Sequence, residues 1–149
     1  MKQALLALAL LGTAALAIQA PGGAAWAQGD VIAQRQAGLK RMGGNVEAIK
    51  KTLESKGDLS VVAERSQDMA AFFHGFPALF PPGSDKGDTH ARSEVWSKRP
   101  EFEAAAARMV AAAIKLNETA KAGDADATAT AFREAGGTCG ACHRQFRSR

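Results

Sequence analysis

Four stretches of this chain carry apolar residues at about every third or fourth position, and this spacing constrains the fold more than any other feature. One face of an α-helix repeats at this interval, so each stretch predicts an amphipathic helix. The apolar positions of the four stretches are Ile32, Leu39, Met42, Val46, Ile49 and Leu53; Leu59, Val62, Met69, Phe72, Phe73 and Phe76; Phe102, Ala106, Met109, Ala113, Leu116 and Ala120; and Phe132, Ala135, Cys139, Cys142 and Phe146. Gly43 and Gly44 interrupt the first stretch, which indicates close packing or a local bend there. Because no stretch alternates as a strand does, we expect an all-α chain folded as an antiparallel four-helix bundle.

Capping and helix-breaking residues predict where these helices begin and end. The expected N-caps are Asp30 for the first helix, Asp58 for the second and Asp124 for the fourth. Pro77 is expected to end the second helix, and Pro100 suits the first turn of the third, which should stop at Gly123. Between the two prolines the chain is rich in proline and glycine, which predicts a long loop joining the second and third helices.

The first 27 residues are expected to be a cleaved secretory signal. Lys2 is followed by an apolar run over residues 4–18, and the small residues Ala25 and Ala27 mark a cleavage point before Gln28. An uncleaved membrane anchor is the alternative, although Pro21 and the glycines after it interrupt the run early. Residues 28–149 are then expected to form a single domain of an exported protein.

The charge of the remaining chain argues against a nucleic-acid partner. Without Lys2, the chain keeps 18 Lys and Arg residues against 15 Asp and Glu residues. This small positive excess is dispersed, and no aromatic side chains are grouped among the basic ones. We therefore expect no binding of nucleic acid.

The two cysteines of the chain lie near its end, in the segment CGACH at 139–143. Positions i, i+3 and i+4 share one face of a helix, so Cys139, Cys142 and His143 would point the same way. This spacing is typical of c-type haem attachment, in which both thiols bond to the porphyrin and the histidine binds the iron. A thiol-redox pair and a zinc site remain alternatives, and zinc would need another ligand such as His74 or His90, neither of which has ligand spacing.

Three segments of the chain resemble the cytochrome c′ family, the class II c-type cytochromes: RQAGL at 35–39, SEVWS at 93–97 and CGACHRQFR at 139–147. The resemblance covers residues 28–149 and implies one covalently attached haem c per chain. It implies that Cys139 and Cys142 hold the haem and that His143 is the axial ligand of the iron. The other haem contacts that it implies are Arg35, Gln36, Leu39, Phe80 and Arg147.

The resemblance also implies a role for each of these contacts. Arg35 and Gln36 would lie at the haem edge, where a guanidinium can pair with a propionate. Leu39 and Phe80 would cover the distal side of the iron. Arg147 would lie on the proximal side, where it either affects ligand exchange or complements the negative end of the helix dipole.

Leu39 determines the function that the resemblance implies. Low-spin relatives carry methionine at this position and use its sulfur as the sixth ligand, whereas leucine leaves the iron five-coordinate and high-spin. We therefore expect a periplasmic cytochrome, not an enzyme, that binds nitric oxide and carbon monoxide and can transfer electrons. The alternative is a low-spin electron carrier with Met42 as the sixth ligand. A homodimer and an unidentified redox partner are also expected.

Overall fold

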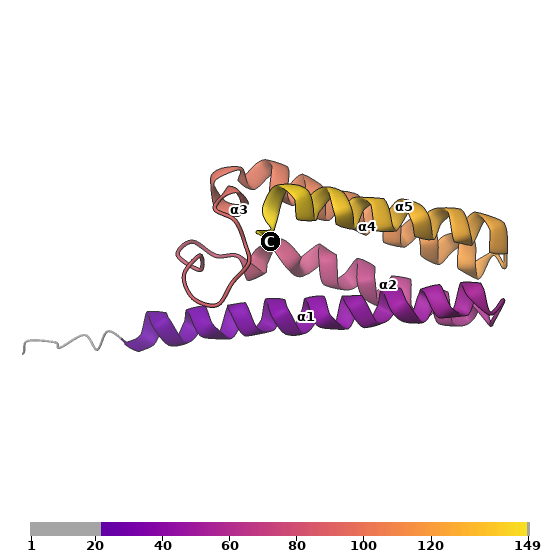
Figure 1. Cartoon of the computed structure of the whole chain (residues 1–149), viewed down its shortest axis with the longest axis horizontal. Helices are drawn as coiled ribbons and strands as arrows, with labels where there is room; N and C mark the ends of the chain where they lie inside the picture. Colours follow the sequence, from indigo (N-terminus) through magenta and orange to yellow (C-terminus); the bar gives the residue numbers. More distant parts are fainter. Residues whose placement is uncertain (1–21, 149) are drawn as a thin grey trace, which may run out of the picture.

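Helices make up nearly all of the regular structure in the computed structural model, which describes residues 22–148 (Figure 1). Four long helices run alternately in opposite directions: α1 (Gly22–Glu54), α2 (Leu59–Gly75), α4 (Arg99–Lys121) and α5 (Ala125–Phe146). Two short helices, η1 (Phe76–Leu79) and α3 (Glu94–Ser97), lie in the connection between α2 and α4. The expected antiparallel four-helix bundle with a long loop is confirmed.

The predicted signal sequence lies mostly outside the described residues. Residues 1–21 are not described, and the backbone of residues 22–27 belongs to α1. Within residues 22–148, no helix is both long and apolar enough to cross a membrane.

The helix ends follow the predicted capping residues, with one exception. The Asp58 carboxylate accepts from the backbone N–H of Ser60 at 2.8 Å, and the Asp124 carboxylate accepts from that of Ala127 at 2.9 Å. Gly123 follows α4 with a φ of 74°, a conformation that glycine adopts without steric cost. The predicted start of the first helix near Asp30 is wrong, because α1 begins at Gly22 and Asp30 lies inside it. Residues 22–29 contain three alanines and three glycines, so helix propensity alone does not explain the earlier start.

The α2–α4 pair forms the centre of the bundle, and α5 packs on α4 while α1 packs on α2. The main core cluster is built from side chains of all four long helices, with Ile49 and Leu116 fully buried. Full burial of such a side chain stabilises the fold by about 2 kcal/mol. Small residues let α2 and α4 approach closely, and the Asn117 side chain donates to the carbonyl of Ala63 at 2.5 Å.

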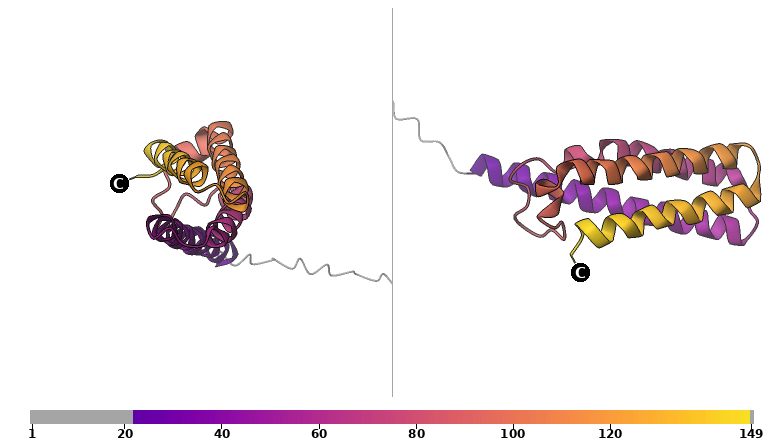
Figure 2. Two further views of the ribbon diagram at one scale, coloured as in Figure 1. Left: turned by 90° about the vertical axis from the view of Figure 1, so that its right-hand side faces the viewer. Right: turned by 90° about the horizontal axis from the view of Figure 1, so that it is seen from above.

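The four helices follow one another around the bundle in the order α1, α2, α4, α5, as the end-on view shows (Figure 2, left). The first and last members of this series, α1 and α5, share at most a marginal contact within the described residues. Three neighbouring pairs of helices, α1–α2, α2–α4 and α4–α5, are therefore packed together. The fourth pair, α1 and α5, hardly touches.

The long loop closes one end of the bundle, at the same end as the last turns of α5 (Figure 1). Backbone hydrogen bonds join the two: Arg92 donates to the carbonyl of Phe146 at 2.9 Å, and Ser148 donates to that of His90 at 2.8 Å. A second core cluster fills this end, with the rings of Phe76, Phe80, Phe102 and Phe146 packed edge to face or tilted. The loop is thus fixed against the C-terminal half of α5.

Candidate functional site

The two thiols of the CGACH segment lie one turn apart on α5 and face the interior. Cys139 packs against the main core cluster, with its sulfur 3.8 Å from that of Met109, whereas Cys142 packs against the phenylalanine cluster at the loop end. Both are free and half-buried. Burial raises the pKa of both thiols, and the neighbouring Cys139 adds to the rise at Cys142. The thiols are therefore protonated at neutral pH and oriented together, as the helical spacing predicted.

His143 lies one turn beyond Cys139 on α5, and its side chain is exposed. It is turned by about 40° around the helix from Cys139, so it lies at the exposed edge of the face that carries the thiols. Partial burial lowers the pKa of His143, and the positive charge of Arg147 lowers it further. The imidazole is therefore neutral at neutral pH, which keeps a nitrogen lone pair available for a metal.

Leu39 and Met42 lie on the same side of α1 and differ in burial. Gly38 touches α2, because a Cβ at this position would overlap the ring of Phe72. Each residue of a helix is turned by about 100° from the one before, so Met42 lies about 40° around the helix from Gly38 and Leu39 about 100° from it, at the edge of the apolar face. The Leu39 side chain is 38% exposed, whereas Met42 is 4% exposed inside the main core cluster. Leu39 is thus less buried than its place on the apolar face suggested.

Arg35 and Gln36 reach from α1 to the loop. The Arg35 Nε donates to the carbonyl of Leu79 at 2.6 Å, and its Nη2 donates to the carbonyl of Ser84 at 3.0 Å and to the Ser84 hydroxyl. Its guanidinium carbon lies 4.2 Å from the centre of the Phe80 ring. Gln36 is exposed, and its amide donates to the carbonyl of Asp88 at 2.9 Å.

The Arg35 side chain is only 3% exposed, and its partners within residues 22–148 are carbonyls and a hydroxyl, not a carboxylate. Its remaining nitrogen, Nη1, is buried with no hydrogen-bond partner in that part of the chain. A buried guanidinium with an unused donor is costly unless an acceptor, preferably an anion, meets it. Arg35 is therefore suited to an anionic group brought by a ligand.

The expected site residues thus form two groups, one on α5 and one on α1 and the loop, and α1 and α5 share at most a marginal contact within residues 22–148. Cys139, Cys142, His143 and Arg147 come from the end of α5, where exposed Arg147 follows the helix. The other four, Arg35, Gln36, Leu39 and Phe80, come from α1 and the loop. Two protonated thiols, a neutral imidazole and a buried cation without an anion fit a covalently attached haem with its propionates.

The two alternative readings of the cysteines gain no support from the surroundings. His74 is exposed on α2, and His90 is exposed in the loop. Among the described residues, no three or more His, Cys, Asp or Glu side chains gather in a way that could hold a metal ion. A thioredoxin-like thiol pair would stand at a helix N-terminus, whereas both thiols here lie in the second half of α5.

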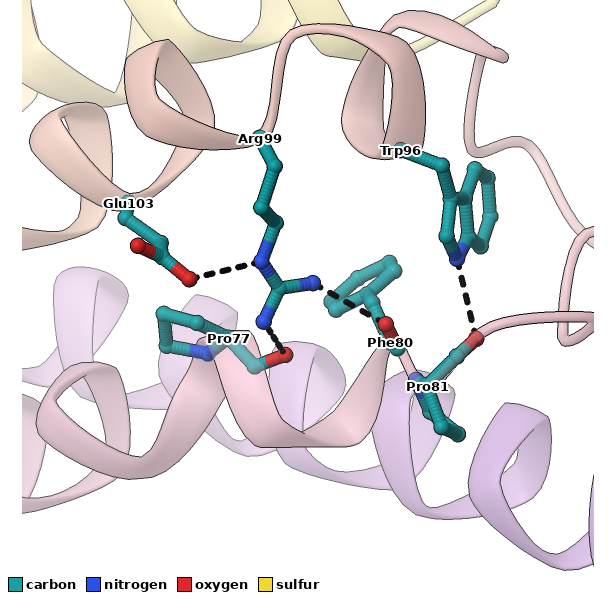
Figure 3. Close-up of polar contacts among 6 residues, drawn as sticks. All are labelled: Pro77, Phe80, Pro81, Trp96, Arg99 and Glu103. Atoms are coloured by element: carbon teal, nitrogen blue, oxygen red, sulfur yellow. Dashed lines mark hydrogen bonds and ion pairs between the residues drawn. The ribbon is translucent and has the colours of Figure 1, made fainter.

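Sequence reasoning missed two residues that hold the loop beside Phe80 (Figure 3). Arg99 donates to the carbonyls of Pro77 and Phe80 at 2.8 and 2.9 Å, and Trp96 donates from its indole N–H to the carbonyl of Pro81 at 3.0 Å. The signal available in the sequence is the proline content of this segment, because prolines bring carbonyls without N–H groups and so leave acceptors for side-chain donors.

Comparisons with known proteins agree on one family. The family model described as cytochrome c′ matches residues 30–147. Cytochrome c′ of Allochromatium vinosum is 36% identical over 123 residues, which cover 79% of this chain and 80% of that protein.

Solved structures of cytochromes c′ also resemble this chain. One cytochrome c′, described as having an unusual ligand-controlled dimer dissociation, is 35% identical with a TM-score of 0.77 and covers 82% of this chain and 97% of its own. A nitric oxide complex of a mutant cytochrome c′ from Alcaligenes xylosoxidans is 25% identical with a TM-score of 0.74, covering 82% and 96%. This chain therefore belongs to the cytochrome c′ family, whose members carry one covalently attached haem c per chain.

Proposed function

We propose that this c-type cytochrome has a five-coordinate, high-spin iron and binds small uncharged gases, above all nitric oxide and carbon monoxide. Cys139 and Cys142 would hold the haem through thioether bonds, and the neutral imidazole of His143 would be the axial ligand. When bound, the haem supplies an iron that can change oxidation state and take a diatomic ligand. Electron transfer is a second capacity of the same centre, and we propose no enzymatic turnover.

The placement of Leu39 and Met42 carries this proposal. Leu39 lies at the edge of the apolar face of α1 with 38% of its surface exposed, and an aliphatic side chain there cannot coordinate iron. Met42, the ligand required by the low-spin alternative, is packed in the core with 4% of its surface exposed. Moving its sulfur out of the core would remove buried apolar contacts, a cost of about 2 kcal/mol or more.

The other residues would hold the haem edge and shape the distal side. Arg35 would offer its unused Nη1 to a propionate, with Gln36 beside it at the exposed rim. Leu39 and Phe80 would make the distal side apolar and crowded, which excludes large or charged ligands. Oxygen would bind poorly, because these two side chains offer bound oxygen no hydrogen-bond donor.

We also propose that the chain is exported to the periplasm, that its signal sequence is removed before Gln28 and that it forms a homodimer. The apolar run at residues 4–18 supports export, and the relative described by its ligand-controlled dimer dissociation supports self-association. Mass spectrometry of protein purified from the periplasmic fraction tests the cleavage point and the addition of one haem. Sedimentation equilibrium tests the dimer.

Absorption and electron paramagnetic resonance spectra of the ferric and ferrous protein test the iron centre. The proposal expects a high-spin spectrum that shifts when carbon monoxide is added. Sharp low-spin bands without added ligand would overturn it in favour of Met42. A purified chain without a Soret band would contradict both versions.

A further inference from the structure

The segment at 77–84, here called the strap, is held almost entirely by side chains from other elements. Three of its eight residues are prolines, which have no N–H to donate. The carbonyls that accept hydrogen bonds from side chains of α1, α3 and α4 belong to Pro77, Leu79, Phe80, Pro81 and Ser84. Their donors are Arg35 of α1, Trp96 of α3 and Arg99 of α4, so three helices determine where the strap lies.

Arg99 makes contacts on both donor edges of its guanidinium (Figure 3). Its Nη2 and Nη1 donate to the carbonyls of Pro77 and Phe80, and its Nε donates to the carboxylate of Glu103, one turn further along α4, at 2.7 Å. The carbonyl of Pro77 also accepts the backbone N–H of Phe80 at 3.1 Å. Arg99 thus binds the carbonyls at both ends of the turn from Pro77 to Phe80, and this turn positions the Phe80 ring.

Trp96 secures the other side of the same ring. Its indole N–H donates to the carbonyl of Pro81, which also accepts the backbone N–H of Ser84 at 3.2 Å. The Trp96 and Phe80 ring centres are 6.0 Å apart. On the inner side, Phe80 meets Phe76 and Phe102 at 4.9 Å each, and Arg35 lies over its face. The Phe80 ring therefore lies between the guanidinium of Arg35 on one side and the segment held by Arg99 and Trp96 on the other.

The ring also has space into which it could move. An open surface groove of about 770 Å³ runs along the strap, and Phe80, Trp96 and Arg99 are among the residues that line it. The hydrogen bonds from Arg99 and Trp96 restrain the backbone next to this groove. Without them, rotation of the strap would let Phe80 leave Arg35 and turn toward solvent.

We propose that Arg99 and Trp96 are positioning residues that hold Phe80 over Arg35 and so set the crowding on the distal side of the iron. The inference rests on the proposed function, because it takes Phe80 as a distal side chain. Neither residue needs to touch the haem. Their effect passes through three backbone carbonyls, those of Pro77, Phe80 and Pro81, and one aromatic ring.

The test compares the haem-loaded wild type with the variants Arg99→Ala and Trp96→Phe, which remove different parts of the clamp. Trp96→Phe keeps an aromatic ring and removes the N–H donor, so it remains informative if Arg99→Ala does not fold. Arg99→Lys is the conservative variant, since one ammonium can reach one of the carbonyls. Arg92→Ala is the matched control, because exposed Arg92 lies in the same loop and its side chain pairs with the Glu94 carboxylate at 2.6 Å, away from the strap.

Two readouts are measured. The first is hydrogen–deuterium exchange at the backbone amides of Phe80 and Ser84, whose acceptors are the carbonyls that Arg99 and Trp96 hold. The second is the rate of carbon monoxide association with the ferrous protein. We expect faster exchange and an association rate raised by about two- to thirty-fold in Arg99→Ala and Trp96→Phe, with partial recovery in Arg99→Lys. Arg92→Ala should match the wild type in both.

Folded Trp96→Phe and Arg99 variants with wild-type exchange and wild-type association rates would overturn the proposal. Faster exchange with an unchanged association rate would also overturn it, because Phe80 would then be free to move without affecting the ligand. A wild-type protein that binds no carbon monoxide at all would instead contradict the proposed function, so the two failures are distinguishable.

Discussion

Leu39 and Met42 are one helical turn apart, yet the contacts of α1 separate them. The neighbour of Leu39, Gly38, touches the ring of Phe72, and this contact fixes the rotation of α1 about its own axis. The same rotation buries Met42 among core side chains and leaves Leu39, about 60° away around the helix, at the more exposed edge of the same face. At the scale of single residues, the choice between a gas-binding and a low-spin cytochrome therefore depends on which of these two side chains can reach the iron.

A reciprocal pair of substitutions tests this choice. Leu39→Met places a thioether at the more exposed position of Leu39, where it can reach the iron. We therefore expect the iron to become six-coordinate and low-spin and to lose rapid carbon monoxide binding. Met42→Leu keeps nearly the same volume in the core and should leave the spectrum unchanged, at a stability cost below about 1.5 kcal/mol. Absorption spectra of both purified variants provide the measurement. A Met42→Leu variant that changes from low spin to high spin would contradict the proposal.

Arg147 and Arg144 offer a second test at this scale. Both carry positive charge near the C-terminus of α5, where it complements the helix dipole, but Arg147 also lowers the pKa of His143 by its charge. If Arg147 affects ligand exchange, Arg147→Ala will change the rate of nitric oxide binding and Arg144→Ala will not. Stopped-flow absorption provides the measurement. Equal rates in the wild type and both variants would leave only the dipole role.

At the scale of helices, α1 packs tightly on α2 at Gly38 and not at Gly43 and Gly44. Of the two alternatives expected at Gly43 and Gly44, close packing and a local bend, close packing is wrong, because a Cβ at either position would meet nothing within 4 Å and both residues are exposed. The tight contact is at Gly38, against the ring of Phe72. Asn45 adds a polar link on the same flank, since its amide donates to the Asp68 carboxylate of α2 at 2.8 Å.

Alanine substitutions at these glycines should have opposite effects. Gly43→Ala adds a methyl group in open space and removes the entropic cost of a helical glycine, so we expect about 1 kcal/mol of stabilisation. Gly38→Ala forces α1 or the Phe72 ring to move, and we expect a loss of about 1–3 kcal/mol from overpacking. Urea denaturation of the two haem-loaded variants measures both. A stabilised Gly38→Ala variant would show that α1 and α2 are less closely packed than described.

At the scale of the whole molecule, the four long helices differ in how many neighbours support them. The central helices α2 and α4 pack on each other and each on one outer helix, whereas α1 packs on α2 and η1 and hardly meets α5 (Figure 2). The proposed haem ligands lie on α5 and the proposed distal residue Leu39 on α1. A haem attached there would join the two outer helices and complete the bundle.

Hydrogen–deuterium exchange along the chain tests this arrangement. In a Cys139→Ser, Cys142→Ser double variant, which cannot form thioether bonds, the amides of residues 31–42 should exchange about tenfold or more faster than those of α2 and α4. The haem-loaded wild type should show a smaller difference, because a ligand bound to both outer helices stabilises them together. Equal protection of all four helices in the double variant would contradict this prediction.

The four long helices with their approximate ends, and the placement of both thiols on the inner side of the last one, could be predicted from the sequence, whereas the short helices η1 and α3 were not expected. Apolar periodicity, capping and the i, i+3, i+4 spacing all act within one or two turns and need no knowledge of neighbouring helices. The start of α1 is an exception, because the helix continues for eight residues before Asp30 although three of them are glycines.

The rotation of α1, its contact with α2 and the side chains that hold the strap follow from packing between helices and could not be predicted from the sequence. These depend on contacts between residues that are far apart in sequence. Arg35 and Ser84 are 49 positions apart, and Arg99 and Pro77 are 22 apart. Sequence alone therefore determined a helical bundle with a haem-binding motif on its last helix. The packing between helices decided that Leu39, not Met42, lies outside the core and that Phe80 is held beside Arg35.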